Sequence, residues 1–255
     1  MNEQRLLVER HGTILELTIN RPHVRNALDR RVSEEIAAAL DELDTNPDLR
    51  VAVLTGAGGN FSSGMDLKAF GHGEIPVVEG RGLAGFAQAP PRKPLIAAVE
   101  GYALAGGFEV ALACDLIVAS RAAVFGLPEV KRSLLAAGGG LIRLSRRIPY
   151  NVAMQLGILG DPIGAPRAAD LGLVNRLTEP GGALAGALAL AEQIATNGPL
   201  GVAAAKKVLA LSADVPEAEA WERQRPINAQ IAESRDAKEG ALAFVEKRAP
   251  VWTGA

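Results

Sequence analysis

Short apolar runs of strand length alternate with helix-compatible segments up to about residue 139 of the chain. Three such runs read "VAVLTG", "PLIAAVEG" and "DLIVAS". Each is short enough for a buried strand and is separated from the next by enough sequence for a helix. Because strands that alternate with helices pack into layers, the pattern predicts an α/β core.

The segments on either side of these runs complete the expected organisation. "LLVERHGTILELTINRP" predicts a hairpin around His11-Gly12, and "SEEIAAALDELDTNPD" predicts a helix with Ser33 as its N-cap and a stop at Pro47. After about residue 139 only "GLVNRLT" still reads as extended, and helices are expected near 183–197, 199–212, 216–232 and 234–247. We therefore expect a core over residues 1–195 and a helical C-terminal region over 196–255.

Composition excludes several classes of protein. The 255 residues carry 27 basic and 29 acidic side chains, a formal net charge of −2, without a long run of either sign. We therefore expect no nucleic-acid partner. The N-terminus predicts neither a signal peptide nor an anchor, and no apolar stretch has transmembrane length, so no membrane association is expected. The single cysteine, Cys114, precludes an internal disulfide and suits a cytoplasmic protein.

A glycine-rich loop, "TGAGGNFSSGMDLKAF", follows the first of the buried runs. It is not a phosphate-binding loop, because Met65-Asp66 stands where that motif requires Lys-Ser/Thr. It is not a dinucleotide fingerprint either, since Phe61 occupies the third glycine position. The loop can still present N–H groups near Gly64 and Met65, just before a short helix opened by Asp66. Such groups suit an anion or a polarised oxygen, although a plain strand-to-helix turn would read the same way.

A second group of backbone donors is expected in "GYALAGGFEVALACDLIVAS", where Gly106 begins a helix. Two donor sites in one core could converge on a carbonyl oxygen as an oxyanion hole. Glu109, one turn into this helix, is a carboxylate in an apolar wall, so it should pair or serve in proton transfer. Glu129, in "FGLPEVKRS", should lie at a strand edge or in a loop. It could share acid and base roles with Glu109, or be a solvated loop residue.

Six motifs in order resemble the enoyl-CoA hydratase/isomerase (crotonase) family. They are "INRPHVRNALD", "VAVLTGAGGNFSSGMDLK", "KPLIAAVEGYALAGGFEVALACDLIVAS", "FGLPEV", "GGGLIRL" and "ADLGLVNRL". The resemblance covers almost the whole chain. It implies a spiral of ββα units, a helical C-terminal region that builds homotrimers or hexamers, and an acyl-CoA substrate. It implies no cofactor beyond the coenzyme A of the substrate, and no metal is expected.

The resemblance also assigns residues. By motif position, Met65 and Gly106 resemble the two backbone donors to the thioester oxygen, and Glu109 and Glu129 resemble the two catalytic acids of hydratases. The segment Met65, Asp66, Leu67 and Lys68 resembles the stretch that contacts CoA. Lys247 falls where the family's tail can approach the CoA nucleotide, sometimes from a neighbouring subunit.

Because both glutamates are present, the resemblance implies an enoyl-CoA hydratase. An enoyl-CoA isomerase that relies mainly on the later acid and a non-catalytic acyl-CoA-binding protein remain alternatives. The tail "EGALAFVEKRAPVWTGA" is similar to that of carnitinyl-CoA dehydratases, which supports a branch of the family more than a substrate. "AAGGGL" replaces a common family run beside the acyl pocket, so an acyl group other than a short simple chain is plausible. Ala137 supplies no aspartate nucleophile, which argues against a dehalogenase.

Overall fold

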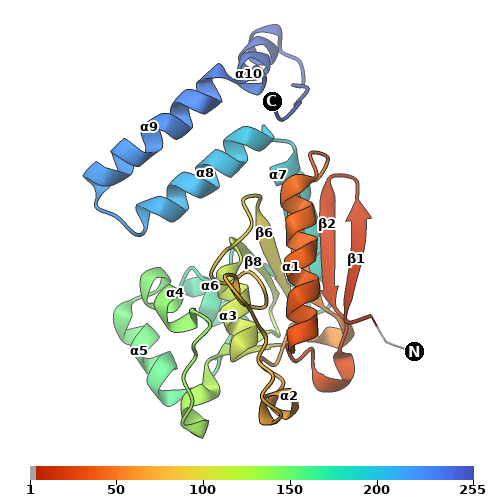
Figure 1. Cartoon of the computed structure of the whole chain (residues 1–255), viewed down its shortest axis with the longest axis vertical. Coiled ribbons are helices and arrows are strands. Elements are labelled where there is room, and N and C mark those ends of the chain that lie inside the picture. Colours follow the sequence, from red (N-terminus) through yellow and green to blue (C-terminus); the bar gives the residue numbers. More distant parts are fainter. Residues whose placement is uncertain (1–3) are drawn as a thin grey trace.

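A six-stranded sheet organises the protein, whose computed structural model describes residues 4–255 (Figure 1). In spatial order the strands are β1 (Leu6–His11), β2 (Ile14–Ile19), β3 (Val51–Gly56), β6 (Leu95–Val99), β8 (Leu116–Ser120) and β11 (Arg176–Thr178). β1 and β2 are antiparallel and the other pairs are parallel. The predicted hairpin, the three predicted buried strands and the extended segment before residue 178 are confirmed.

Helices cover both faces of this sheet, as a mainly parallel sheet requires. Successive side chains of a strand point to opposite faces. Leu54 accordingly joins the large core cluster on the side of α1 (Arg30–Thr45) and α3 (Gly106–Ala113), whereas Val53 joins a smaller cluster with α7 (Ala183–Ala195). Figure 1 shows α1 and α3 in front of the sheet and α7 behind it. The layered α/β core is therefore confirmed.

A second, smaller sheet stands beside the first. It consists of β7 (Tyr102–Leu104), β9 (Val124–Gly126) and β10 (Ile163–Gly164), with β9 in the middle. The order β6, β7, α3 is one ββα unit, and β8, β9 and the 3₁₀ helix η3 (Pro128–Arg132) begin the next. A two-strand ribbon, β4 (Val77–Val78) with β5 (Gly82–Leu83), lies between β3 and β6 in sequence. Runs of two or three residues show no periodicity, which is why the sequence did not predict β4, β5 and β10.

Helix α1 starts earlier than predicted, and Ser33 is not its N-cap. The cap is Asp29, whose Oδ1 accepts a hydrogen bond from Val32 N at 2.9 Å. Ser33 is buried in the first turn and its hydroxyl donates to the Asp29 carbonyl at 2.8 Å. A Ser and an Asp four residues apart are both plausible caps. Asp29 serves because it also pairs with the guanidinium of Arg21 at 3.2 Å.

Short helices fill the connections of the core. They are η1 (Pro22–Val24), η2 (Ala57–Gly59), α2 (Leu67–Gly71), α4 (Gly140–Arg147), α5 (Tyr150–Leu159) and α6 (Ala165–Asp170).

The chain ends in a C-terminal arm, residues 199–255, which contains α8 (Pro199–Ser212), α9 (Glu217–Glu233) and α10 (Arg235–Glu246). The arm projects from the core at the end opposite α2 (Figure 1). Neither α8 nor α9 has a buried residue. The four predicted C-terminal helices are confirmed, whereas the boundary between residues 195 and 196 stays a prediction.

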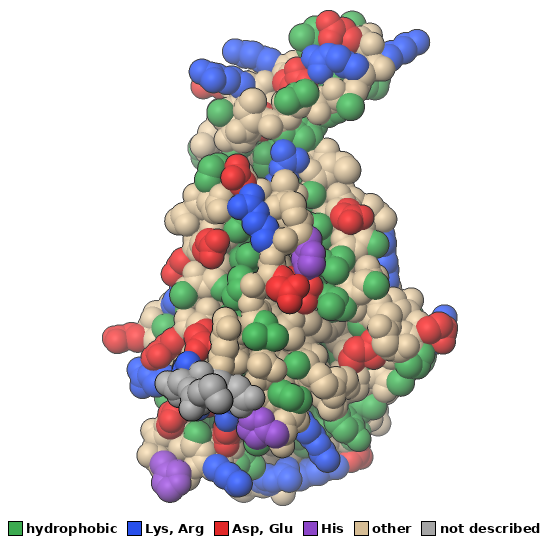
Figure 2. All heavy atoms as spheres, turned by 90° about the vertical axis from the view of Figure 1, so that its right-hand side faces the viewer, with side chains coloured by type: hydrophobic (Ala, Val, Ile, Leu, Met, Phe, Trp, Pro, Cys, Tyr) green, Lys and Arg blue, Asp and Glu red, His purple; other side chains and the backbone are tan. Residues whose placement is uncertain are grey.

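The surface beside β1 carries charged side chains of both signs, with apolar side chains between them (Figure 2). On the arm, large apolar side chains are exposed, among them Leu209, Trp221, Phe244 and Val245. Within residues 4–255, no helix combines the length and the apolar character needed to cross a membrane.

Candidate active site

The glycine-rich loop after β3 is held against β7 by backbone pairing. Ser62 N donates to the Tyr102 carbonyl at 2.9 Å, and Leu104 N donates to the Ser62 carbonyl at 3.0 Å. At Gly107 the start of α3 touches this loop so closely that a Cβ would collide with the Ser62 carbonyl. The absence of a side chain at Gly107 is thus needed for the loop and the helix to meet.

This contact brings the N–H groups of Met65 and Gly106 together. A Cβ built on Gly106 would lie 3.6 Å from Met65 N. On the other side of the loop, Leu28 N donates to the Gly64 carbonyl at 2.7 Å and Asp66 N donates to the Leu28 carbonyl at 2.8 Å. Met65 is thereby held by its two neighbours. Within residues 4–255, neither Met65 N nor Gly106 N donates a hydrogen bond, so both remain available to a ligand oxygen.

Asp66 is occupied by the protein itself. One carboxylate oxygen caps α2 by accepting from Lys68 N at 3.0 Å, which confirms the predicted helix start, and the other accepts from Arg21 at 2.8 Å. Burial raises the pKa of Asp66, but the hydrogen bonds and the charge of Arg21 outweigh it and leave the pKa below its ordinary value. The side chains of Leu67 and Lys68 are exposed beside it.

Lys247 lies far from this segment within one chain. It is exposed at the end of α10, on the C-terminal arm, whereas Met65 to Lys68 lead into α2 at the opposite end of the long axis (Figure 1). A single copy of the protein therefore does not bring Lys247 to the other predicted CoA contacts.

Glu109 is a buried carboxylate, with 4% of its surface exposed, in the first turn of α3. Its Oε1 accepts a hydrogen bond from Gly140 N at 2.9 Å, at the start of α4. Burial raises the pKa of Glu109, and the N–H groups of Gly140 and Gly138 and the positive charge of Arg143 limit that rise. The carboxylate thus has partners that favour its charged form.

Glu129 has a different environment. It lies in the first turn of the short 3₁₀ helix η3, three residues after β9, where the sequence predicts a strand edge or a loop. Its Oε2 is buried and has no hydrogen-bond partner in the described part of the chain. Burial raises the pKa of Glu129 to about 7, and the nearby charge of Glu109 adds to the rise, while its own backbone N–H opposes it. A carboxyl group with an unpaired oxygen favours its protonated form.

A chain of contacts links the donors to the carboxylates, and Glu129 is near enough to Glu109 for its charge to act on it. A methyl carbon of Leu83 lies 3.5 Å from the position of a Cβ on Gly106 and also packs against Gly138, which in turn contacts Glu109. Glu129 follows β9, whose neighbour β7 leads directly to Gly106. Two N–H donors beside two carboxylates of unequal pKa can polarise a carbonyl and move protons next to it.

Sequence reasoning missed the partners of Glu109. Gly138 and Gly140 come 29 and 31 residues after it, and Arg143 follows on α4. Gly139 adopts φ 97°, the left-handed region that favours glycine, just before α4 begins. The available signal was therefore the triple glycine before a helix, which resembles the other two donor sites in composition.

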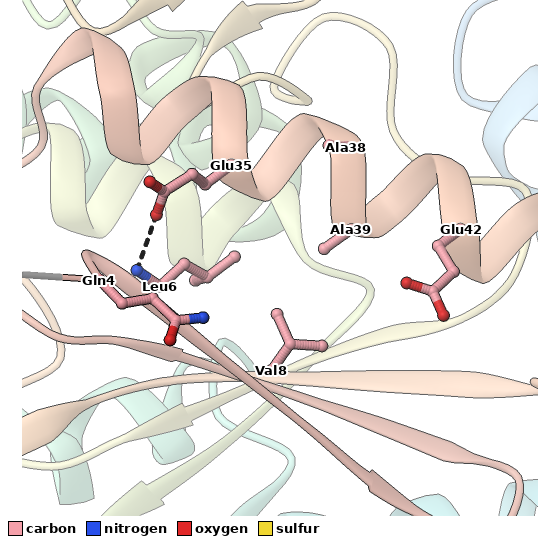
Figure 3. A pocket seen from close by; sticks show the side chains of 7 residues that line it. All are labelled: Gln4, Leu6, Val8, Glu35, Ala38, Ala39 and Glu42. Carbon is pink, nitrogen blue, oxygen red and sulfur yellow. Dashed lines mark hydrogen bonds between the residues drawn. The ribbon is translucent and has the colours of Figure 1, made fainter.

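A groove of about 340 Å³ lies elsewhere, between α1 and the edge strand β1 (Figure 3). Leu6 and Val8 line it from β1 and Ala39 from α1, and Glu35 reaches down from α1 to accept a hydrogen bond from Leu6 N at 2.9 Å. None of its lining residues belongs to the predicted site, so the groove is separate from the N–H donors and the two glutamates.

Two other reactive residue types lie outside the site. Cys114 is fully buried, and burial raises its pKa far above the ordinary value, so it is no nucleophile. Glu9, His11 and Glu16 come together on the hairpin of β1 and β2. His11 contacts Glu16 at 2.9 Å and Thr18 donates to Glu16 at 3.0 Å, so the Glu16 carboxylate already has partners within the protein.

Comparison with known proteins identifies the family and the fold. The family model for enoyl-CoA hydratase/isomerase matches residues 9–255. The chain belongs to this family. A solved enoyl-CoA hydratase of Mycobacterium marinum, EchA1, is 57% identical and superposes with a TM-score of 0.97, covering 99% of this chain and 100% of that one. The family resemblance and the crotonase-like α/β fold predicted from the sequence are confirmed.

Curated relatives within the enoyl-CoA hydratase/isomerase family are more distant. Enoyl-CoA hydratase EchA19 of Mycobacterium tuberculosis is 42% identical, over 96% of this chain and 94% of its own length. Carnitinyl-CoA dehydratase of Shigella flexneri is 40% identical, over 98% of both chains. The similarity to carnitinyl-CoA dehydratases that the tail predicted thus extends over almost the full length of the chain.

Proposed function

We propose that this protein is an enoyl-CoA hydratase, which adds water reversibly across the 2,3 double bond of a 2-enoyl-CoA thioester. The observation that carries this function is the placing of two carboxyl groups, Glu109 and Glu129, beside the free N–H groups of Met65 and Gly106. An isomerase that moves a double bond needs one acid, whereas addition of water needs a proton acceptor and a proton donor.

In the proposed reaction, Met65 N and Gly106 N donate to the thioester oxygen and stabilise the negative charge that develops there. The Glu109 carboxylate accepts a proton from water while the water oxygen bonds to C3. Glu129, protonated, gives its proton to C2. One proton then passes from Glu109 to Glu129, directly or through water, before the next turnover. No metal or cofactor is needed, because the coenzyme A is part of the substrate.

The CoA moiety is proposed to lie along Met65, Asp66, Leu67 and Lys68. Because the Asp66 carboxylate is held by Arg21 and by the cap of α2, the contact of Asp66 with CoA would be made by its backbone. Lys247 would reach the CoA phosphates only from a second copy of the chain, since one copy separates it from α2.

The function is tested by the loss of conjugated-enoyl absorbance with a panel of 2-enoyl-CoA esters: short, long, crotonobetainyl and steroid-side-chain. Rapid loss with one ester supports hydration and identifies the acyl class. A 3-enoyl thioester is measured in parallel, and formation of a conjugated enoyl group from it, without hydration of any 2-enoyl ester, would establish an isomerase. Binding without any turnover would overturn the enzymatic assignment.

The pKa of Glu129 predicts that kcat/KM has the same pH dependence for hydration and for dehydration. Hydration requires protonated Glu129, so kcat/KM for hydration is expected to fall as the pH rises through about 7. Addition of water takes up and releases no net proton, so the equilibrium constant fixes the ratio of kcat/KM in the two directions at every pH. The kcat/KM for dehydration should therefore fall over the same range. Glu129→Gln should lower both rates and lose this limb. A limb near pH 7 that persists in the variant would assign it to another group.

The same group predicts how stability depends on pH. Because the folded pKa of Glu129 is above the unfolded value of 4.5, the native protein keeps a proton that the unfolded chain releases between about pH 4.5 and 7. This group therefore lowers the free energy of unfolding as the pH rises through that window. Urea unfolding should show that the free energy of unfolding falls less between pH 5 and pH 8 for Glu129→Gln than for wild type.

We also propose that the C-terminal arm assembles the protein into homotrimers, paired or unpaired, in the cytoplasm. Support comes from the exposed apolar side chains of the arm and from the lack of buried residues in α8 and α9, since isolated apolar faces favour association. Light scattering is expected to give a molar mass of three or six chains. Phe244→Glu should lower it, and a monomeric wild type would contradict this assembly.

A further inference from the structure

Arg143 is a charged residue that the proposed reaction does not use, yet it lies against the turn that holds Glu109. It is half-buried on α4, and its guanidinium donates to the Ala87 carbonyl and, at 3.4 Å, to the Gly138 carbonyl. The side chain also folds over Gly139, so closely that a Cβ on Gly139 would collide with it. Arg143 therefore restrains the backbone of the turn 138–140.

The turn that Arg143 braces supplies the hydrogen bond to Glu109. Gly140 N donates to Glu109 Oε1, and Gly138 packs against the same carboxylate. Ala87 lies four residues after Leu83, the side chain that contacts both Gly106 and Gly138. One guanidinium thus links the turn to the segment that carries Leu83.

We propose that Arg143 is a positioning residue for the Glu109 base: by bridging the carbonyls of Ala87 and Gly138 it holds the Gly140 N–H and its own positive charge against the carboxylate. The planar guanidinium presents its donors in a rigid fork, so its two Nη atoms hold the two carbonyls at a fixed spacing, which the flexible side chain of a lysine would not fix. This inference rests on the proposed function, because a base has to be positioned only if Glu109 accepts a proton.

The charges around the pair determine what removal of Arg143 should do. Glu109 is faced by Arg143 from α4 and by Glu129 from η3. Arg143 itself is faced by Arg146 and Arg147 on its own helix and by Cys114 at the end of α3. Arg143 is the cation among these whose charge lowers the pKa of Glu109, opposing burial. Without Arg143 the pKa of Glu109 should rise, so Glu109 should stay protonated up to a higher pH.

The experiment compares Arg143→Gln, Arg143→Lys and the control Arg146→Gln on the ester that wild type hydrates. Arg146 is on the same helix, is exposed, and pairs with Asp214 at 2.5 Å without touching the turn. Arg143→Gln is expected to lower kcat about tenfold or more with little change in KM, and to move the acid limb of kcat/KM upward by about one pH unit. Arg143→Lys should keep the acid limb of kcat/KM at the wild-type pH but recover only part of the wild-type kcat. Arg146→Gln should behave as wild type.

The ionisation of Glu109 is also measured directly, by ¹³C NMR of carboxyl-labelled glutamate, with the resonance identified by its loss in Glu109→Gln. An upward shift of its titration in Arg143→Gln supports the positioning role even if no ester is turned over, in which case only the hydratase assignment fails. An unchanged titration in Arg143→Gln overturns the inference, including when kcat falls, because a purely structural role would then suffice. If Arg143→Gln does not fold, the titration in Arg143→Lys is expected to stay near wild type while kcat falls; a wild-type kcat in that variant overturns the inference.

Discussion

Glu109→Gln is expected to lower kcat for hydration by roughly 10²–10⁴-fold, the usual contribution of a positioned acid or base. The amide is close in shape to the carboxyl group and can still accept the hydrogen bond from Gly140 N through its oxygen. It cannot accept a proton from water. Because the Met65 and Gly106 donors are untouched, the Kd for a CoA ester should stay within a few-fold of wild type.

The measurement combines single-ester kinetics with calorimetric binding of a saturated acyl-CoA. Glu42→Gln is the matched control, since Glu42 is an exposed glutamate on α1, outside the proposed site. It is expected to keep the wild-type kcat. Turnover by Glu109→Gln within threefold of wild type would mean that another group accepts the proton, and loss of binding would mean that Glu109 shapes the pocket instead.

Gly64→Ala is expected to reduce kcat by roughly 10²–10³-fold, the effect of losing one oxyanion donor. Gly64 adopts φ 94°, and its new Cβ would lie 2.8 Å from the Cβ of Ala105 and 2.9 Å from Gly106 N. The substitution therefore pushes the loop that carries Met65 away from the start of α3, which carries Gly106. Ala105 has little room to yield, because it already adopts φ 51° and ψ −130°, a strained conformation for a residue with a side chain.

Gly172→Ala separates backbone strain from this steric effect. Gly172 also has a positive φ, 81°, but a Cβ there meets no atom within 4 Å. Both variants should lose stability, measured as the midpoint of thermal unfolding, because alanine is disfavoured at positive φ. Only Gly64→Ala should lose activity. Equal kcat for Gly64→Ala and wild type, in a folded protein, would rule out the Met65 and Gly106 pair as the oxyanion hole.

Much of the fold was predictable because it depends on local patterns. The hairpin, the buried strands and the four C-terminal helices follow from periodicity and turn residues, and the structure confirms them. The start of α1 was predicted wrongly, since two capping residues compete and Asp29 also forms ion pairs with Arg21 and with Arg5, which lies 24 residues earlier in the chain. Local chemistry alone does not contain that information.

In the candidate site too, the features that depend on local sequence were predicted, and those that depend on distant residues were not. The sequence identified Glu109 and the two glycine-rich donor loops because a carboxylate in an apolar run and glycines before helices are visible locally. It did not identify Gly140, which donates to Glu109, or Arg143, which contacts the turn 138–140. Both lie on a helix more than thirty residues further along the chain. Neither did it foresee that Arg21 would occupy the Asp66 side chain. Such pairings arise from packing between distant elements.

The order of strands in the large sheet has a consequence for how the protein is made. From β1 to β11 every strand lies next to the one that precedes it in that sheet along the chain, so during synthesis each new strand meets an edge that already exists. Met65, Gly106, Glu109, Glu129 and Arg143 are all synthesised before the final strand and the arm. The emerging chain thus contains every proposed catalytic group while the surface that would recruit other copies is still being translated.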